Sequence, residues 1–162
     1  MVLKKIIIGI DPGKNGGIAF LDEQGNVLNV SPMPETVGDL HNLLCEVNGY
    51  EHDNIVCYLE KVGGMPGQGG SAMFSFGRNY GHIEMALIAL QIPTVSVTPQ
   101  KWQQYFSVGG VSITKSSSAE KRQHKNKLKE KAQQMFVKEI KKITLKTCDS
   151  LLIAEYGRRH EI

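Results

Sequence analysis

The 162-residue chain has little cysteine, and this scarcity excludes two kinds of cross-linked structure. Its three cysteines, Cys45, Cys57 and Cys148, are odd in number, lie in apolar segments and have no Cys-x-x-Cys spacing. We therefore expect neither a disulfide framework nor a zinc site, and we interpret all three as buried small hydrophobic residues. The five histidines show no metal-ligand spacing either.

Long hydrophobic runs are also missing. No stretch approaches the length of a membrane span, and the first residues lead into a strand-like segment without the features of a signal peptide. We expect an intracellular protein. The length suits one domain over residues 1–162 with a substantial core, and no internal repeat divides the chain.

Net charge is only +3, but its distribution is uneven. Between Lys115 and Lys146 eleven Lys and Arg residues stand against three Glu residues, a net charge of +8; eight basic and thirteen acidic residues leave the rest at −5. A basic block joined to an acidic core suits a protein that grips a polyanionic backbone and carries out metal chemistry on it. A solvated helix face remains an alternative explanation of the block.

Two carboxylates stand where short apolar runs end. Asp11 closes the first run and opens a Gly-Pro turn, and Glu60 closes a later run just before a glycine-rich stretch. If both runs are neighbouring strands, the two acids lie side by side at one edge of the sheet and stay ionised only with a cation between them. Gly16 and Gly17 are expected to leave room for a bulky anion, so this edge suits a metal or a phosphate.

Apolar periodicity predicts a mixture of strands and helices. Strands are predicted over residues 6–11, 17–21, 27–30, 55–60 and 94–97, the second and third forming a hairpin. Helices are predicted over residues 40–47 and 73–90, at Trp102, from the capping box at Ser117 through Phe136, and from near Thr147 onward. This element order is that of the ribonuclease H-like α/β fold, a mixed five-stranded sheet with helices on both faces.

Five segments, in order, match the motifs of one family. They are Ile8–Gly13, Tyr58–Val62, Phe76–Gly81, Val97–Trp102 and Cys148–Ala154. Together they resemble RuvC-type Holliday-junction resolvases, especially the compact bacteriophage members, over nearly the whole chain. The resemblance implies one RuvC-like nuclease domain over residues 1–162. It also implies a homodimeric endonuclease for DNA recombination and repair, in the cytoplasm of a bacterial or phage-infected cell, which nicks a four-way DNA junction symmetrically.

The resemblance also assigns the catalytic site. Asp11, Glu60 and Asp149 fall on metal-binding carboxylates that would hold two Mg²⁺ ions, with Mn²⁺ as a substitute, although the helix dipole alone explains an acid at position 149. The family's fourth ligand, an Asp or His one turn earlier, is replaced by Lys146, which cannot bind Mg²⁺ while protonated. Glu155 lies too far around the helix to substitute, and water would complete the coordination.

DNA contacts are assigned to the basic block and the glycine-rich loop. Backbone contacts are expected from Lys61, Lys115, Lys121, Arg122, Lys125, Lys127 and Lys129. In the loop at residues 63–70, Met65 is expected to wedge between bases at the crossover, a plain surface loop being the alternative. Phe74 and Phe76 are expected to pack in the protein, and Gly77 and Gly81 to allow a close backbone approach.

Three other functions compete with that of a resolvase. An ATPase of the actin or sugar-kinase type opens similarly but needs two lobes, about twice this length. A non-catalytic junction-binding protein fits the lysine at position 146. A branched-DNA or flap nuclease of the same fold also stays open, because the sequence does not show which DNA structure the basic face fits.

Overall fold

Five strands form one mixed sheet in the computed structural model, which describes residues 5–47, 49–63, 67, 69–110 and 115–161. The strands are β1 (Ile6–Asp11), β2 (Gly17–Asp22), β3 (Val27–Pro32), β4 (Ile55–Glu60) and β5 (Thr94–Val97). They lie in the order β3-β2-β1-β4-β5; β1, β2 and β3 pair antiparallel, whereas β4 is parallel to both β1 and β5. The predicted mixed sheet is confirmed.

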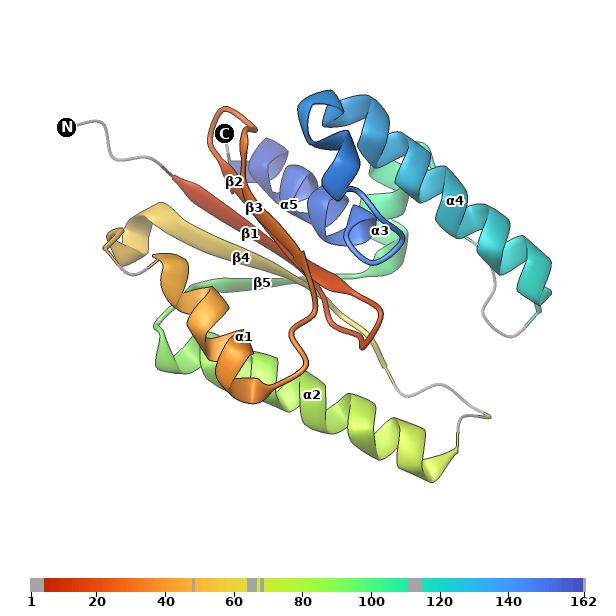
Figure 1. Cartoon of the computed structure of the whole chain (residues 1–162), viewed down its shortest axis with the longest axis horizontal. Coiled ribbons are helices and arrows are strands. Elements are labelled where there is room, and N and C mark those ends of the chain that lie inside the picture. The colour runs from red at the N-terminus through yellow and green to blue at the C-terminus, as the bar shows by residue number, and fades with distance from the viewer. Residues whose placement is uncertain (1–4, 48, 64–66, 68, 111–114, 162) are drawn as a thin grey trace.

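Helices cover both faces of this sheet (Figure 1). One face carries α1 (Val37–Leu44) and α2 (Gly70–Ala89); the other carries α3 (Pro99–Tyr105), α4 (Ser118–Met135) and α5 (Cys148–Glu161). Short 3₁₀ turns are Cys45–Val47, His52–Asn54 and Val137–Lys142. Each side chain of β1 points to one of two cores: Ile7 joins the core under α5, and Ile8 joins the core under α1 and α2. None of the described helices is long and apolar enough to cross a membrane.

The α5 helix packs directly on the centre of the sheet. A Cβ atom on Gly9 of β1 would lie 2.2 Å from the backbone oxygen of Ser150 and 2.4 Å from the backbone nitrogen of Ala154. No side chain fits at this position, so the glycine at position 9 allows α5 to pack directly against β1. This contact fixes the height of Asp149, one residue before Ser150, above the strand that ends in Asp11.

The N-terminal half of α2 differs from the predicted packing. Ile83 and Leu87 are buried, but the side chain of Phe74 is 72% exposed and Met73 is exposed as well. The prediction that Phe74 packs in the protein is therefore wrong, whereas Phe76 is half-buried with its ring near Tyr80.

The glycines of α2 also differ from expectation. Gly77 and Gly81 face open space, so they allow no close backbone approach within the described chain. The physical reason is geometric, because only the C-terminal turns of α2 lie against the sheet (Figure 1). A further correction concerns Cys45, which is only partly buried beside His41, while Cys57 and Cys148 are buried as predicted.

Candidate functional site

Two of the predicted carboxylates meet at the carboxyl edge of the sheet. Asp11 is the last residue of β1 and Glu60 the last residue of β4. These strands are parallel with Ile10 beside Leu59, so the next residues along each strand, Asp11 and Glu60, leave the sheet at the same edge. The third carboxylate, Asp149, comes from the first turn of α5, which crosses β1.

The turn after Asp11 is closed tightly by glycine. The amide of Gly13 donates to the Asp11 carbonyl (3.1 Å), and a Cβ atom on Gly16 would lie 2.1 Å from that same carbonyl oxygen. A Cβ on Gly17 would lie 2.7 Å from the Lys146 carbonyl oxygen. The expectation that these glycines leave room for an anion is therefore wrong for Gly17, where protein backbone fills the space, whereas Gly16 lines an open hollow beside Asp11. Both glycines also let the chain pack closely around Asp11.

Lys125 of α4 reaches into the carboxylates. Its ammonium Nζ lies 3.7 Å from Asp11 Oδ2 and donates a hydrogen bond to Asp149 Oδ2. The sequence pattern placed Lys125 among residues that contact the DNA backbone and did not reveal this position. A signal was present, since Lys125 precedes the buried Leu128 and Ala132 by three and seven residues, which places it on the inner side of α4.

Glu60 has a different partner. The buried indole of Trp102 in α3 donates from Nε1 to Glu60 Oε1 at 2.8 Å. The prediction that Trp102 anchors a short helix in the core is confirmed, but its role in orienting Glu60 was not foreseen. Cys148 similarly donates from its thiol to Asp149 Oδ1 at 3.3 Å, so this cysteine is more than a small hydrophobic filler.

Burial and neighbouring carboxylates raise the pKa values of Asp11 and Glu60. Burial, followed by the negative charge of Asp149, raises the pKa of Asp11 to about 6. Burial, followed by the charge of Asp11, raises the pKa of Glu60 to about 8 although the Trp102 hydrogen bond opposes the rise. Burial disfavours the charged form of Lys125, but Asp149 and Asp11 outweigh it and raise the pKa of the ammonium. A positive charge placed between these acids would therefore stabilise the site.

Carboxylate oxygens are the ligands that Mg²⁺ prefers. Asp11 and Asp149 already converge on one cation, the Lys125 ammonium, whereas Glu60 is turned toward Trp102. Across the residues that the structure describes, no three acidic, His or Cys side chains are grouped closely enough to hold one ion. The donor chemistry of Asp11 and Asp149 thus fits a divalent cation, and Glu60 lies at the same sheet edge.

Lys146 lies at the rim of this site. It is exposed and lines an open hollow together with Asp11, Lys14 and Lys125. Glu155, the other residue considered as a ligand, is buried in ion pairs with Arg158 and Arg159. Its carboxylate is therefore committed to a structural contact within α5.

The remaining basic residues lie mostly on the surface. Exposed side chains belong to Lys61, which follows β4, and to Lys115, Lys121, Arg122 and Lys127, while Lys129 is partly buried. Most of them lie on α4, on the same side of the sheet as α5 (Figure 1). Met65 lies outside the described residues. Contact of these residues with DNA stays a prediction.

Solved structures with this arrangement of elements exist. RuvC from Thermus thermophilus in complex with a Holliday-junction substrate superposes with a TM-score of 0.65 over 96% of this chain and 95% of that chain, at 14% identity. A second Thermus thermophilus RuvC structure gives a TM-score of 0.56, with 96% of each chain covered at 16% identity. In sequence, no family model and no curated protein matches. The ribonuclease H-like fold predicted for this chain is confirmed, in the form found in RuvC.

Proposed function

We propose that this protein is a metal-dependent, structure-selective endonuclease that resolves Holliday junctions by symmetrical nicking of DNA. The observation that carries the proposal is the convergence of Asp11 and Asp149 on one positive charge, with Glu60 at the same sheet edge. Burying acids together at one sheet edge is costly and is typical of a functional site, and the RuvC-like fold supports a nuclease there. The bound partner of the Thermus thermophilus protein, a Holliday junction, supports branched DNA as the substrate.

The cofactor that we propose is Mg²⁺, as two ions, with Mn²⁺ as a substitute, held by Asp11, Glu60 and Asp149. When bound, the metal would activate the attacking water and stabilise the leaving oxygen of the phosphodiester. Asp11, whose neighbours on both sides are acids, is best placed to be shared between ions. Trp102 holds one Glu60 oxygen and leaves the other for a ligand.

Lys125 has two consecutive roles in this proposal. Without metal its ammonium pairs with Asp11 and Asp149, and its charge opposes the rise in the pKa of Asp11. A divalent cation held by Asp11 and Asp149 would replace the ammonium as their counter-charge, and the ammonium would then be available to the negative charge of the substrate phosphate. Lys125 is thus a member of the reaction centre, and the other basic residues of α4 position the DNA arms.

Symmetrical nicking needs two active sites, so we propose a homodimer. The outer side of α2 carries a stripe of exposed apolar residues and glycines at helical spacing: Phe74, Gly77, Gly81, Met85 and Ile88. This stripe lies opposite the buried Ile83 and Leu87, and Met85 and Ile88 are 59% and 68% exposed. An apolar stripe of this length is costly to leave in water, and a second copy of α2 would cover it.

The stripe is self-complementary when two copies run antiparallel about Gly81. Residues equally far from Gly81 then face each other, which places Phe74 opposite Ile88 and Gly77 opposite Met85 of the second copy. Met85 thereby meets the small Gly77, Phe74 and Ile88 form an apolar contact, and Arg78 faces Glu84 at the margin. Such isologous pairing is what a two-fold symmetric dimer requires.

Cleavage of three labelled DNA substrates tests the proposal. Purified protein with Mg²⁺ is incubated with a synthetic four-way junction, a flap and a linear duplex of matched sequence. We expect paired, symmetrically placed nicks on the four-way junction alone. Nicking of the flap would instead favour the branched-DNA nuclease, and binding without nicking would favour a junction-binding protein.

An Asp11→Asn variant assigns the activity to this site. The amide keeps the size and hydrogen bonding of the carboxylate but removes its charge, so nicking should be abolished while binding to the junction persists. Gel-shift and nicking assays on one preparation measure both. Parallel loss of binding and nicking would mean that Asp11 holds the fold and not the metal.

A further inference from the structure

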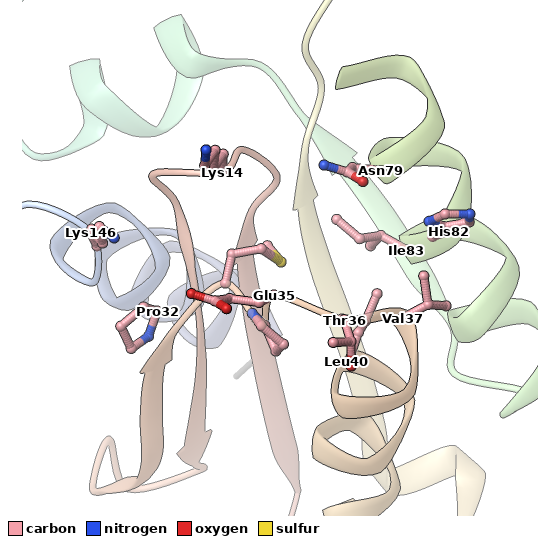
Figure 2. Close-up of a pocket in the computed structure, with 12 residues that line it drawn as sticks. Lys14, Pro32, Glu35, Thr36, Val37, Leu40, Asn79, His82, Ile83 and Lys146 are labelled. Atoms are coloured by element: carbon pink, nitrogen blue, oxygen red, sulfur yellow. The ribbon is translucent and has the colours of Figure 1, made fainter. Parts of the chain in front are cut away.

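A cavity of about 750 Å³ shares two lining residues with the hollow that contains Asp11, and none of the roles above uses it. It lies between α2 and the segment that joins β3 to α1, beside the turn that follows β1 (Figure 2). Its volume falls within the range of pockets that hold small ligands. Its composition indicates what kind of ligand fits.

Two lysines connect this cavity to the catalytic edge. Lys14 in the turn after β1 and Lys146 just before α5 line the cavity, and both also line the hollow that contains Asp11 and Lys125. A DNA strand with its scissile phosphate at Asp11 would therefore meet two ammonium groups where it passes into the cavity. This charge pattern suits the sugar-phosphate part of an adjacent nucleotide.

Beyond the lysines the cavity wall changes character. Met33 and Ile83 supply apolar surface, while Asn79 and His82 of α2 and Glu35 supply donors and acceptors (Figure 2). Apolar walls with a few polar groups are how proteins hold a nucleobase taken out of its stack. Asn pairs with the edge of adenine, and a Glu carboxylate accepts from the amino group of cytosine.

The cavity and the catalytic turn are also mechanically joined. The backbone amide of Met33 donates to the carbonyl of Gly16 at 2.9 Å, and Gly16 packs against the backbone of Asp11. A ligand that contacts Met33 is thereby held at a fixed position relative to the Asp11 carboxylate. Occupation of the cavity can in this way set which phosphate lies at the acids.

We propose that this cavity binds one unstacked nucleotide of the cleaved strand, next to the scissile phosphate, and so determines the base preferred at the nick. Lys14 and Lys146 bind its phosphate, Met33 and Ile83 contact the base, and Asn79, His82 and Glu35 read its edge. The proposal rests on the proposed function, because it needs a DNA strand at Asp11.

The test uses four-way junctions with 2-aminopurine, a base whose fluorescence rises when it leaves the stack. The probe is placed in turn on each side of the mapped nick, in the presence of EDTA so that the strand stays intact, and binding is followed by anisotropy in the same samples. We expect a severalfold rise at one of the two positions with the native protein.

An Asn79→Trp variant fills the cavity without touching the carboxylates. Asn79 is exposed on α2, so the larger side chain is tolerated by the fold. The matched control is Gln24→Trp, an exposed position in the hairpin turn between β2 and β3. We expect the fluorescence rise to be lost in Asn79→Trp and kept in Gln24→Trp, with junction binding preserved in both.

Base preference supplies the second readout. On junctions that differ only in the base next to the nick, Asn79→Ala should lower the ratio of the fastest to the slowest nicking rate by about tenfold. Replacing Lys14 and Lys146 together by Gln should slow nicking on every base equally, because phosphate contacts carry no sequence information.

The outcomes separate the two proposals. If the native protein nicks the junction but fluorescence and base preference are the same in Asn79→Trp, no base enters the cavity and this inference is overturned while the proposed function stands. If the native protein neither binds nor nicks four-way DNA, the proposed function is wrong, and the proposal of a nucleotide site is then wrong as well.

Discussion

At the scale of single residues, the carboxylate edge is a balance of like charges around one lysine. Asp11, Glu60 and Asp149 are buried or nearly so, and burial and the charge of neighbouring carboxylates oppose the ionisation of Asp11 and Glu60. The positive charge of the Lys125 ammonium offsets this repulsion. The metal-free and metal-bound states should therefore differ in what neutralises the acids, and this difference is measurable.

Replacing Lys125 by Met tests the neutralising role. With the acids ionised and no metal present, loss of the ammonium should lower the free energy of unfolding by about 1–3 kcal/mol, or roughly 5 °C in Tm, because the carboxylates are left unpaired. Thermal melts at pH 8 with EDTA and with Mg²⁺ measure the effect. The Mg²⁺-induced rise in Tm should be larger in the variant than in the native protein.

The control for Lys125→Met is Lys127→Met on the exposed side of α4. Both changes remove one lysine charge, but only the first lies among the acids, so Lys127→Met should leave the melting curve and its Mg²⁺ response nearly unchanged. Equal responses in the two variants would show that Lys125 does not compete with metal. At saturating Mg²⁺, Lys125→Met should still nick more slowly, because the phosphate loses a positive partner.

Stability without metal should fall as pH rises. The pKa of Glu60 is about 8 in the folded protein against an ordinary value of 4.5, so the folded state holds its proton more tightly than the unfolded state does. The stabilisation is complete below about pH 4.5 and is lost progressively as pH rises to about 8, amounting to roughly 3–5 kcal/mol. The raised pKa of Asp11 also makes the folded protein less stable as pH rises, and this contribution is lost by about pH 6.

Melting curves from pH 5 to pH 9 in EDTA and in Mg²⁺ test this pH dependence. Tm in EDTA should fall by roughly 10 °C across the range, and Mg²⁺ should restore more of it at pH 8 than at pH 6, because ligands must be deprotonated to bind metal. In Glu60→Gln, the slope in EDTA should flatten. A native Tm that rises with pH in EDTA would contradict the raised pKa of Glu60.

At the scale of elements, the sequence was most informative where a strand end carried a charge. The periodicity predicted β1, β4 and the first turn of α5, and with them the placement of Asp11, Glu60 and Asp149. It was less informative about surfaces. The apolar spacing of α2 gave no sign that Phe74 is exposed, because an interface stripe and a core stripe have the same period.

Contacts between distant elements were the part that sequence did not predict. The Trp102–Glu60 hydrogen bond joins α3 to β4, and Lys125 joins α4 to both β1 and α5. Such pairs depend on how helices cross the sheet, which no local pattern encodes. Gly16 and Gly17 were recognised as special, but the sequence did not reveal the close backbone approach that requires a glycine at both positions.

A Gly9→Ala substitution tests the crossing of α5 over β1. A Cβ there meets backbone atoms that cannot rotate away, so α5 must lift, at a cost of about 3 kcal/mol or more. Urea unfolding should show this loss, and nicking should fall further than stability explains because Asp149 moves away from Asp11. The control Gly38→Ala, on exposed α1, should be neutral or stabilising by up to about 1 kcal/mol.

The surface of α4 makes a separate prediction about DNA. Replacing Lys127 and Lys129 by Ala should weaken junction binding and reduce the slope of log affinity against log salt by about 0.9 for each phosphate that the variant no longer touches. Binding titrations at several salt concentrations measure the slope. Lys138→Ala, on the exposed turn after α4, is the matched control. An unchanged slope in the double variant would place the DNA on another surface.

At the scale of the whole molecule, the two sides of the sheet carry different surfaces. Helices α4 and α5 lie on one side of the sheet and α2 lies on the other (Figure 1). The α4 helix carries the basic residues, and α2 carries the exposed apolar stripe. The carboxylate edge lies between them, where β1 and β4 end. DNA can therefore bind on the side of α4 while a second copy of the chain binds on the side of α2, and neither partner covers the acids.

A Gly81→Arg substitution tests the antiparallel pairing of α2. Gly81 faces open space in the chain, so an arginine is compatible with the fold and favours the helix, but it places two large charged side chains at the proposed two-fold axis. Light scattering should show a dimer for the native protein and a monomer for the variant. Nicks on the two opposing strands of the junction should then become uncoupled.

The register of that pairing is tested by exchanging two charges. Arg78→Glu alone puts like charges opposite each other and should weaken the dimer, whereas Arg78→Glu combined with Glu84→Arg restores opposite charges and should recover it. Recovery would require that residue 78 of one copy faces residue 84 of the other, which a parallel or shifted pairing does not provide. If the double variant dimerises no better than Arg78→Glu, α2 pairs in another register. A native protein that stays monomeric while nicking both strands together would mean that DNA, and not α2, brings the two active sites into line.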